Sequence, residues 1–366
     1  MSLKAGIVGL PNVGKSTLFN AITKKNILAA NYPFATIDPN IGVVTVPDKR
    51  LEFLENMYIP NSLVPTTFEF TDIAGLVKGA SKGEGLGNKF LSHIREVDAI
   101  VEVVRCFNDE NIIHVEGGVD PIRDIEIINL ELILADLEII ENRIDKIQKK
   151  AETTKDKEAL KEVETLKKAK ESLLNYQALR LVEFDEDELF ILKPFNFITL
   201  KPIIYVANVI EDDIALGENE YTKLVQEYAG KEGAGVITMC AKIESELAEL
   251  EESDKMAFLK DLGISYSGLD KLIFATYDLL GLQTFFTVGK DEVRAWTFRK
   301  GTNAKKCAGL IHSDIERGFI KAEIMKFNDL EELNDEKKVQ EAGKLYLEGK
   351  DYVMQDGDIV YFRFNV

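Results

Sequence analysis

The sequence predicts an α/β fold with a doubly wound, mostly parallel sheet, and three observations lead to this prediction. Runs of apolar and β-branched residues, typical of strands buried on both faces, recur at 99–104, 202–208 and 235–240, and an alternating strand pattern at 67–72 ends at Asp72. Segments with helical spacing separate these runs. In addition, a short apolar strand at 4–9 leads through a glycine-containing loop into a helix at 16–23. The carboxyl ends of such strands are where this kind of sheet binds its ligands.

Residues 9–17 read Gly-Leu-Pro-Asn-Val-Gly-Lys-Ser-Thr and fit the phosphate-binding pattern Gly-x-x-x-x-Gly-Lys-[Ser/Thr]. Backbone N–H groups of such a loop converge on phosphate oxygens, and the following helix adds its positive end. Lys15 is expected to reach the β- and γ-phosphates, and the Ser16 hydroxyl to ligate Mg²⁺. The residues expected to hold the nucleotide here are Asn12, Val13, Gly14, Lys15, Ser16 and Thr17.

Two further segments complete the expected magnesium and phosphate site. Asp72 ends a strand and can hold the water shell of Mg²⁺, and Gly75 can offer its N–H to the γ-phosphate. Thr36, in a proline-punctuated loop at 31–40, is expected to be a second hydroxyl ligand, although alone it reads as an ordinary loop threonine. The glycine-rich segment 79–87 is interpreted as a nucleotide-dependent switch, the alternative being a plain surface loop.

The residues after the strand at 202–208 bear on the choice of base. Proteins of this class that select guanine carry Asn-Lys-x-Asp there, whereas this chain has Asn208, Val209 and Glu211. A glutamate cannot keep the aspartate's bidentate geometry, so strict guanine selection is weakened. Cys240 and Ala241 lie where a base-contacting backbone is expected. Asn208 could instead be a simple strand-end cap.

Together these motifs resemble the YchF / Obg-like ATPase family, a branch of the Obg group of P-loop proteins. The resemblance covers essentially the whole chain. It implies ATP binding, often in preference to GTP, slow hydrolysis, association with ribosomes, a helical hairpin insertion and a C-terminal TGS domain. It also suggests His114 as a group that polarises the attacking water, the alternative being an exposed loop histidine.

The pattern of apolar and charged residues changes between 120 and 184. Leu137, Ile140, Ile144 and Ile147 have coiled-coil spacing, a similar pattern resumes at 160–173, and polar residues lie between the two. This predicts an antiparallel helical hairpin inserted between two strands of the sheet. It is interpreted as a partner-binding arm, with simple packing on the domain as the alternative.

A hairpin at 283–288 and 292–298, a mixed helical stretch, and strands at 351–353 and 358–364 predict a small β-grasp domain, which fits the ubiquitin-like TGS resemblance. The expected domains are therefore a P-loop domain at 1–281, interrupted by the insertion at 120–184, and a TGS-like domain at 282–366.

The net charge of −18 argues against general nucleic-acid binding. A local basic stretch could nevertheless face RNA, with Trp296 and Phe298 interleaved, and an equally good reading is a solvated face over core aromatics. The basic residues are Lys290, Arg294, Arg299, Lys300, Lys305 and Lys306. The expected partners are thus ATP or GTP, and the ribosome or its RNA through the hairpin or the TGS-like domain.

The expected activity is slow ATP hydrolysis, because Leu76 stands where Ras-like enzymes orient water with a glutamine. Asn12 is expected to help hold K⁺, which could act like an arginine finger. A GTP-specific enzyme and a nucleotide-tuned scaffold without turnover are the alternatives, and a P-loop kinase is disfavoured. No apolar run is long enough for a membrane span. Cys106, Cys240 and Cys307 are isolated and are expected to be reduced thiols in a cytoplasmic protein, which we also expect to be a monomer.

Overall fold

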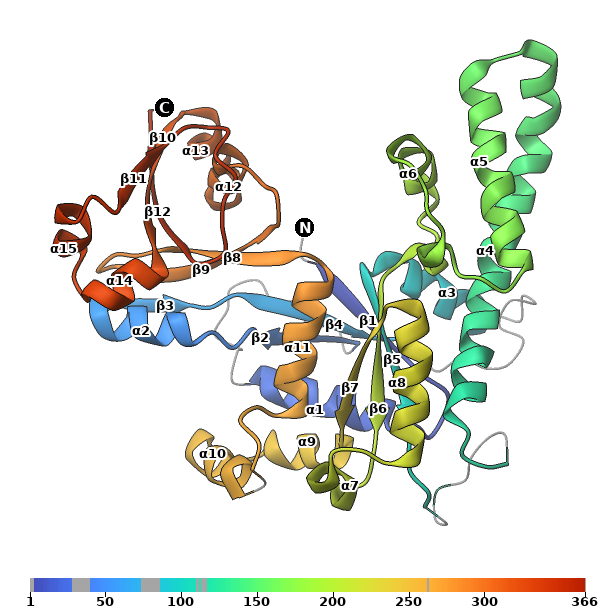
Figure 1. Ribbon diagram of the computed structural model, residues 1–366, viewed down its shortest axis with the longest axis horizontal. Helices are drawn as coiled ribbons and strands as arrows, with labels where there is room; N and C mark the ends of the chain where they lie inside the picture. Colours follow the sequence, from blue (N-terminus) through green and yellow to red (C-terminus); the bar gives the residue numbers. More distant parts are fainter. Residues whose placement is uncertain are drawn as a thin grey trace. The chain divides into compact units, whose positions relative to one another are not determined.

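A computed structural model describes residues 3–27, 40–73, 86–109, 112, 117–261 and 263–365 (Figure 1). The chain forms two compact units, one of Met1–Val44 and Glu69–Leu272, the other of Thr45–Phe68 and Ile273–Val366. Packing therefore does not follow a single cut between 281 and 282, because an early segment belongs with the C-terminal residues. The domain limits given above remain a prediction.

The first unit is organised by a six-stranded sheet with the order β2-β4-β1-β5-β6-β7, in which β4, β1, β5, β6 and β7 pair in parallel. Its strands are β1 (Lys4–Val8), β2 (Ile41–Thr45), β4 (Thr67–Asp72), β5 (Ala99–Arg105), β6 (Ile203–Asn208) and β7 (Gly235–Met239). Every residue of β5 and β6 is buried, as expected for central parallel strands. The α/β fold class is confirmed.

Helices connect the strands of this sheet, as a parallel arrangement requires. They include α1 (Lys15–Ile27), α3 (Leu86–Glu96), α7 (Glu211–Leu216) and α8 (Glu220–Glu232). Three more helices follow β7, namely α9 (Ala241–Leu247), α10 (Glu252–Asp261) and α11 (Gly268–Leu279), the last of which continues into the second unit. Helix α8 packs against β6 and β7, and α1 contacts β1 and α9. Among the described residues, no helix has both the length and the apolar character that crossing a bilayer requires.

The inserted hairpin is formed by α4 (Pro121–Thr154) and α5 (Lys157–Leu174), which lie side by side (Figure 1). Asp120 and Asp156 cap the two helices, and Lys155 makes the turn with a left-handed φ of 52°. Ile140, Leu166 and Ala169 are fully buried in its seam. The first turns of α4 pack on β5 and α8, so one helix serves both the hairpin and the domain core.

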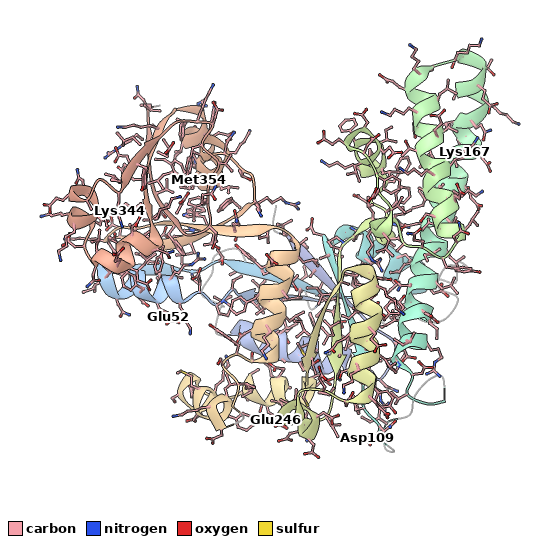
Figure 2. The ribbon with its side chains drawn as sticks, in the orientation of Figure 1. Glu52, Asp109, Lys167, Glu246, Lys344 and Met354 are labelled. Carbon is pink, nitrogen blue, oxygen red and sulfur yellow. The ribbon has the colours of Figure 1, made fainter. Side chains whose placement is uncertain are left out.

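Short helices return the chain from the hairpin to the sheet. They are η2 (Leu179–Leu181), α6 (Glu186–Leu192), η3 (Lys193–Phe195) and η4 (Ile198–Leu200). Phe197 and Leu192 join the hairpin core, and Asp136 of α4 accepts hydrogen bonds from the backbone of Ile198 and Thr199 at 3.2 and 2.8 Å. The insertion is thereby fixed at its base. Lys167 of α5 lies on the exposed face of the hairpin (Figure 2).

The second unit holds a sheet with the order β11-β10-β12-β8-β9-β3. Its strands are β3 (Ser62–Val64), β8 (Leu282–Thr287), β9 (Glu292–Arg299), β10 (Phe319–Lys326), β11 (Leu345–Glu348) and β12 (Asp358–Phe364). The expected hairpin of β8 and β9 is confirmed. The prediction of a strand at 351–353 is wrong, since Val353 makes only an isolated bridge to Asn303, and β10 and β11 occupy part of the stretch expected to be helical.

An early segment completes this second sheet. Helix α2 (Lys49–Tyr58) places Leu51 and Leu54 in a core with Phe286, and β3 pairs in parallel with β9 at the sheet edge. Further helices are α12 (Ala304–Ile311), α13 (Ser313–Arg317), α14 (Phe327–Leu333) and α15 (Glu336–Glu341). A second core forms around Met354, which Figure 2 labels inside this unit.

The aromatic residues of the basic stretch belong to that second core. Phe298 is buried beside Phe285, and Trp296 is half-buried, donates to Thr287 Oγ1 at 2.9 Å and lies under the Arg294 guanidinium at 4.2 Å. Phe298 therefore cannot stack on RNA bases. The reading of this residue as a core aromatic is correct.

A buried polar cluster links the hairpin base to the first sheet. Glu102 of β5 is fully buried, and neither carboxylate oxygen has a hydrogen-bond partner among the described residues. Arg180 donates to Glu232 Oε2 at 2.9 Å, and Tyr205 donates to the same oxygen at 3.1 Å. Burial raises the pKa of Glu102 well above its usual value, although the nearby charge of Arg180 lowers it and those of Glu232 and Asp124 raise it.

We predict that the stability of the Glu102→Gln variant, measured relative to that of the parent protein, increases as pH rises from 5 to 8. The folded parent holds this proton more tightly than the unfolded chain, so its stability falls as pH rises above the unfolded pKa of about 4.3 and through the raised folded pKa. Glutamine mimics the neutral carboxyl and removes that dependence. The measurement is the difference in melting temperature at each pH, with the exposed Glu164→Gln as control. A difference that stays constant would mean that Glu102 is already ionised at pH 5.

Candidate nucleotide-binding site

The loop between β1 and α1 has a backbone that only a few residue types adopt. Asn12 and Gly14 have left-handed φ values of 65° and 99°. A Cβ on Gly14 would lie 2.2 Å from Asn208 Nδ2, and one on Gly9 would lie 2.8 Å from the carbonyl oxygen of Val103. Both glycines are thus required, one by φ and contact and the other by close approach to β5.

Lys15 opens α1 and is almost completely buried. Its Nζ lies 2.5 Å from Asp72 Oδ1 and donates to the Ile73 carbonyl at 3.0 Å. The two motifs meet because Asp72 stands opposite Ile7 at the adjoining ends of β4 and β1. The Ser16 hydroxyl follows on the exposed start of the same helix. A hydroxyl and a carboxylate are oxygen donors that suit Mg²⁺.

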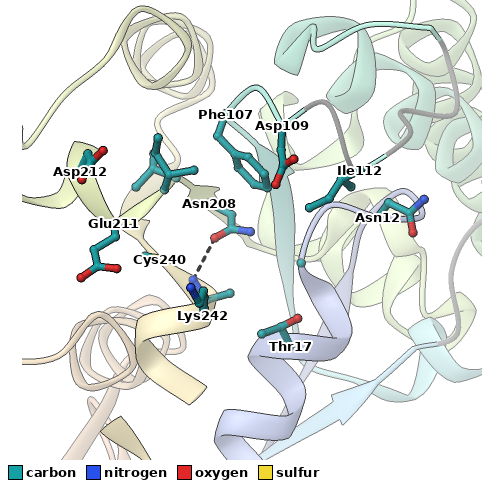
Figure 3. A pocket seen from close by; sticks show the side chains of 14 residues that line it. Asn12, Thr17, Phe107, Asp109, Ile112, Asn208, Glu211, Asp212, Cys240 and Lys242 are labelled. Atoms are coloured by element: carbon teal, nitrogen blue, oxygen red, sulfur yellow. Dashed lines mark hydrogen bonds between the residues drawn. The ribbon is translucent and has the colours of Figure 1, made fainter. Parts of the chain in front are cut away.

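Asn208 joins two loops at the carboxyl edge of the sheet. Its Nδ2 donates to the Val13 carbonyl at 2.8 Å, and its Oδ1 accepts from the Ala241 N–H at 2.9 Å (dashed in Figure 3). The side chain is buried. Its interpretation as a simple strand-end cap is too narrow, since it ties the phosphate loop to the segment after β7.

Next to this link lies a cavity of about 600 Å³ (Figure 3). Most residues expected to contact the base line it. The lining residues are Asn12, Gly14, Thr17, Phe107, Asp109, Ile112, Asn208, Val209, Ile210, Glu211, Asp212, Cys240, Ala241 and Lys242. The volume is that of a small-molecule site, and its position beside the phosphate loop suits the nucleoside part of a nucleotide.

The cavity walls combine apolar surface with charge. Val209 is buried, where a guanine-selective protein would lay a lysine stem along the base. Glu211 is exposed at the rim, and Lys242 lies at the start of α9. Burial raises the pKa of the Cys240 thiol, so the thiol stays neutral and contributes packing rather than charge.

The structure brings together most of the expected site residues. Val13, Lys15, Ser16 and Asp72 lie beside the cavity in the phosphate loop and at the end of β4, rather than among its lining residues. Three expected residues, Thr36, Gly75 and His114, lie outside the described residues, as do Leu76 and the glycine-rich segment at 79–85. Their roles remain predictions.

In the loop that follows β5, only His114 was predicted to have a role, and the part of this loop that forms a cavity wall was not predicted. Phe107, Asp109 and Ile112 line the cavity on the side away from Glu211 and Lys242 (Figure 3). A signal was present, since the carboxyl ends of all central strands in such a sheet point to the ligand side. For this reason, the residues after Arg105 could have been predicted to line the ligand site.

Comparison with known proteins agrees with this geometry. A family described as a 50S ribosome-binding GTPase matches residues 4–142, and the family YchF-GTPase_C, described as a protein of unknown function, matches residues 282–365. The Ribosome-binding ATPase YchF of Bacillus subtilis (strain 168) is 60% identical over 367 residues, covering 100% of both chains. The chain belongs to the YchF family.

Other members of the YchF family agree. The Ribosome-binding ATPase YchF of Escherichia coli O157:H7 is 51% identical over the full length of both chains. The structure of the Schizosaccharomyces pombe YchF GTPase matches with a TM-score of 0.90 at 43% identity, covering 99% of this chain and 98% of that one. The YchF fold therefore extends over both compact units.

Proposed function

We propose that this protein is a ribosome-associated ATPase that binds ATP in the cavity beside Asn208 and hydrolyses it slowly to ADP and phosphate. The observation that carries the proposal is the Asn208–Val209–Glu211 edge of that cavity, joined to the phosphate loop by the Asn208 side chain. The names of the full-length relatives, Ribosome-binding ATPase YchF, support it. The nucleotide state would switch the affinity for the ribosome.

Base selection follows from what the cavity offers. Guanine selection depends on an aspartate that accepts two hydrogen bonds from the base, and Glu211 at the rim carries one more methylene than that geometry allows. The apolar wall of Val209 and Ala241 accepts any flat base. Asn208 is committed to Val13 and Ala241 and adds no guanine-specific contact through these two bonds. Adenine is therefore tolerated.

Charge neutralisation would be shared between the loop and a metal ion. Ser16 and Asp72, with Thr36, would hold Mg²⁺, which when bound neutralises charge on the phosphates. Lys15 would exchange its contact with Asp72 for the β- and γ-phosphates. Asn12 is proposed to help hold K⁺ near the same phosphates, and His114 to orient the attacking water in place of the glutamine that Leu76 replaces.

Two alternative functions can be distinguished from slow ATP hydrolysis by measuring nucleotide affinity and phosphate release. A GTP-specific enzyme would bind GTP far more tightly than ATP. A scaffold without turnover would bind ATP but release no phosphate, with or without ribosomes. A ribosome-binding protein with this sequence is further proposed to act in the cytosol as a monomer.

Docking on the ribosome is assigned to the hairpin of α4 and α5, to the C-terminal TGS-like domain, or to both. Three exposed basic residues at the end of β9 and in α12, Arg299, Lys300 and Lys306, provide a local positive surface on an acidic protein, with Lys306 also paired to Glu316 at 2.7 Å. Lys290 lies at the opposite end of β9. Such a patch is needed because the overall field repels RNA. With Phe298 in the core, its contacts would be mainly to phosphate.

We predict that ATP binds at least as tightly as GTP. Val209→Lys combined with Glu211→Asp should shift the affinity ratio toward GTP by about ten-fold, since it restores a hydrogen-bonded pair. Calorimetric titration with ATP, GTP and ADP in Mg²⁺ measures this, and the exposed Glu227→Asp is the matched control. Strong GTP preference in the parent protein would leave the GTPase reading as the better one.

We predict that Lys15→Ala lowers ATP turnover, measured as phosphate release, by about a hundred-fold, because a positive charge at the transferred phosphoryl group is lost.

We predict that turnover of the parent protein is faster in potassium than in sodium buffer. Asn12→Gly should remove that difference, because glycine keeps the left-handed φ and deletes only the side chain. Phosphate release is the readout. Equal rates in both buffers would exclude the K⁺ site.

We predict that reversing the charge of Arg299, Lys300, Lys305 and Lys306 lowers co-sedimentation of the ATP-bound protein with ribosomes several-fold at low salt, and that the difference from the parent protein narrows as salt weakens the phosphate contacts of the parent. ATP affinity should hold. Reversal of Lys223, Lys231, Lys260 and Lys271 gives the same change of net charge elsewhere and serves as control. If this variant and a hairpin deletion both sediment normally, docking occurs through the nucleotide-binding domain.

A further inference from the structure

Arg105 ends β5 and turns its side chain toward the segment that follows. The residue is only 1% exposed. Its guanidinium donates to three backbone carbonyls, those of Phe107 at 3.1 Å, Asp109 at 3.2 Å and Ile112 at 3.0 Å. It also lies 4.7 Å from the centre of the Phe107 ring. One side chain thus holds the backbone of Phe107, Asp109 and Ile112.

The three residues that Arg105 holds are the same three that form one wall of the cavity. Phe107, Asp109 and Ile112 all line it, and Figure 3 shows them on the side away from Glu211 and Lys242. Arg105 itself is not among the lining residues. Arg105 therefore lies behind the residues that form this wall and holds them without contacting the cavity itself.

The support stands on a rigid element. Arg105 belongs to a strand buried along its whole length and paired in parallel with β1 and β6. The neighbouring Cys106 N–H donates to the Asn208 carbonyl at 2.8 Å, which couples the wall to the residue that ties the phosphate loop. A planar fork with donors in several directions is the group that can reach three carbonyls at once.

We infer that Arg105 is a positioning residue that sets the affinity for the nucleoside part of the bound nucleotide. By holding Phe107, Asp109 and Ile112 at the cavity edge, it preorganises the surface against which base and ribose pack, and the ligand need not order these residues on binding. The inference rests on the proposed function, since it assumes that the cavity takes a nucleotide.

The experiment uses Arg105→Lys, which keeps the charge but cannot bridge three carbonyls. ATP binding in Mg²⁺ should weaken about ten-fold, the worth of one charge-assisted hydrogen bond. Binding of inorganic tripolyphosphate, which occupies only the phosphate loop, should change less than two-fold. Arg180→Lys is the matched control, because it alters another buried arginine of the same unit, away from the cavity, and should leave both affinities unchanged.

A second variant covers failure of Arg105→Lys to fold. Asn108 Nδ2 donates to the Tyr221 hydroxyl at 2.8 Å and ties the same segment from its exposed side. Tyr221→Phe should weaken ATP binding about three-fold, less than the loss of a full hydrogen bond, and again spare tripolyphosphate.

The outcomes separate clearly. Equal losses for ATP and tripolyphosphate, or a lowered melting temperature with unchanged ATP affinity, would overturn the positioning role. Binding of neither ATP nor GTP by the parent protein would instead overturn the proposed function.

Discussion

The two hydrogen bonds of the Asn208 side chain are the constraint on which the rest of the site depends. One reaches the phosphate loop and the other the segment after β7, so the phosphate and base sides of the site cannot move apart independently. The same amide fixes the residue type at position 14, because a Cβ there would lie 2.2 Å from its nitrogen. A buried amide with both ends satisfied is stable only while both loops hold their places.

Local signals were sufficient to predict the phosphate loop and the central parallel strands of the first unit. Strand, glycine loop and helix follow one another within 4–27, and the companion aspartate lies at the end of an adjoining strand, so short-range pattern and parallel topology determine the site. The hairpin could also be predicted from the sequence, because Ile140, Ile144 and Leu166 follow coiled-coil spacing, and all three are buried in the structure. In these cases periodicity and packing point to the same answer.

Contacts between distant segments were not predictable in this way. Nothing in the sequence of α2 and β3 says that they complete a sheet formed by residues some 230 positions later. Arg105 carries no motif, because its partners are backbone carbonyls, which every residue possesses. Phe298 was ambiguous for another reason. Alternation along a strand shows that one face is buried but does not say which side chains reach solvent.

The pairing of an early segment with the end of the chain also bears on synthesis. Leu51 and Leu54 are made about 230 residues before Phe286, their partner in the core. At roughly 5–20 residues per second, the apolar face of α2 waits on the order of 10–50 s for its cover. Strand β12, which lies between β10 and β8, ends at Phe364, so the strand order of this sheet is complete only after that residue has been made. The nascent chain of this protein therefore presents to the ribosome that makes it the uncovered apolar face of α2 throughout synthesis of the nucleotide-binding strands that follow.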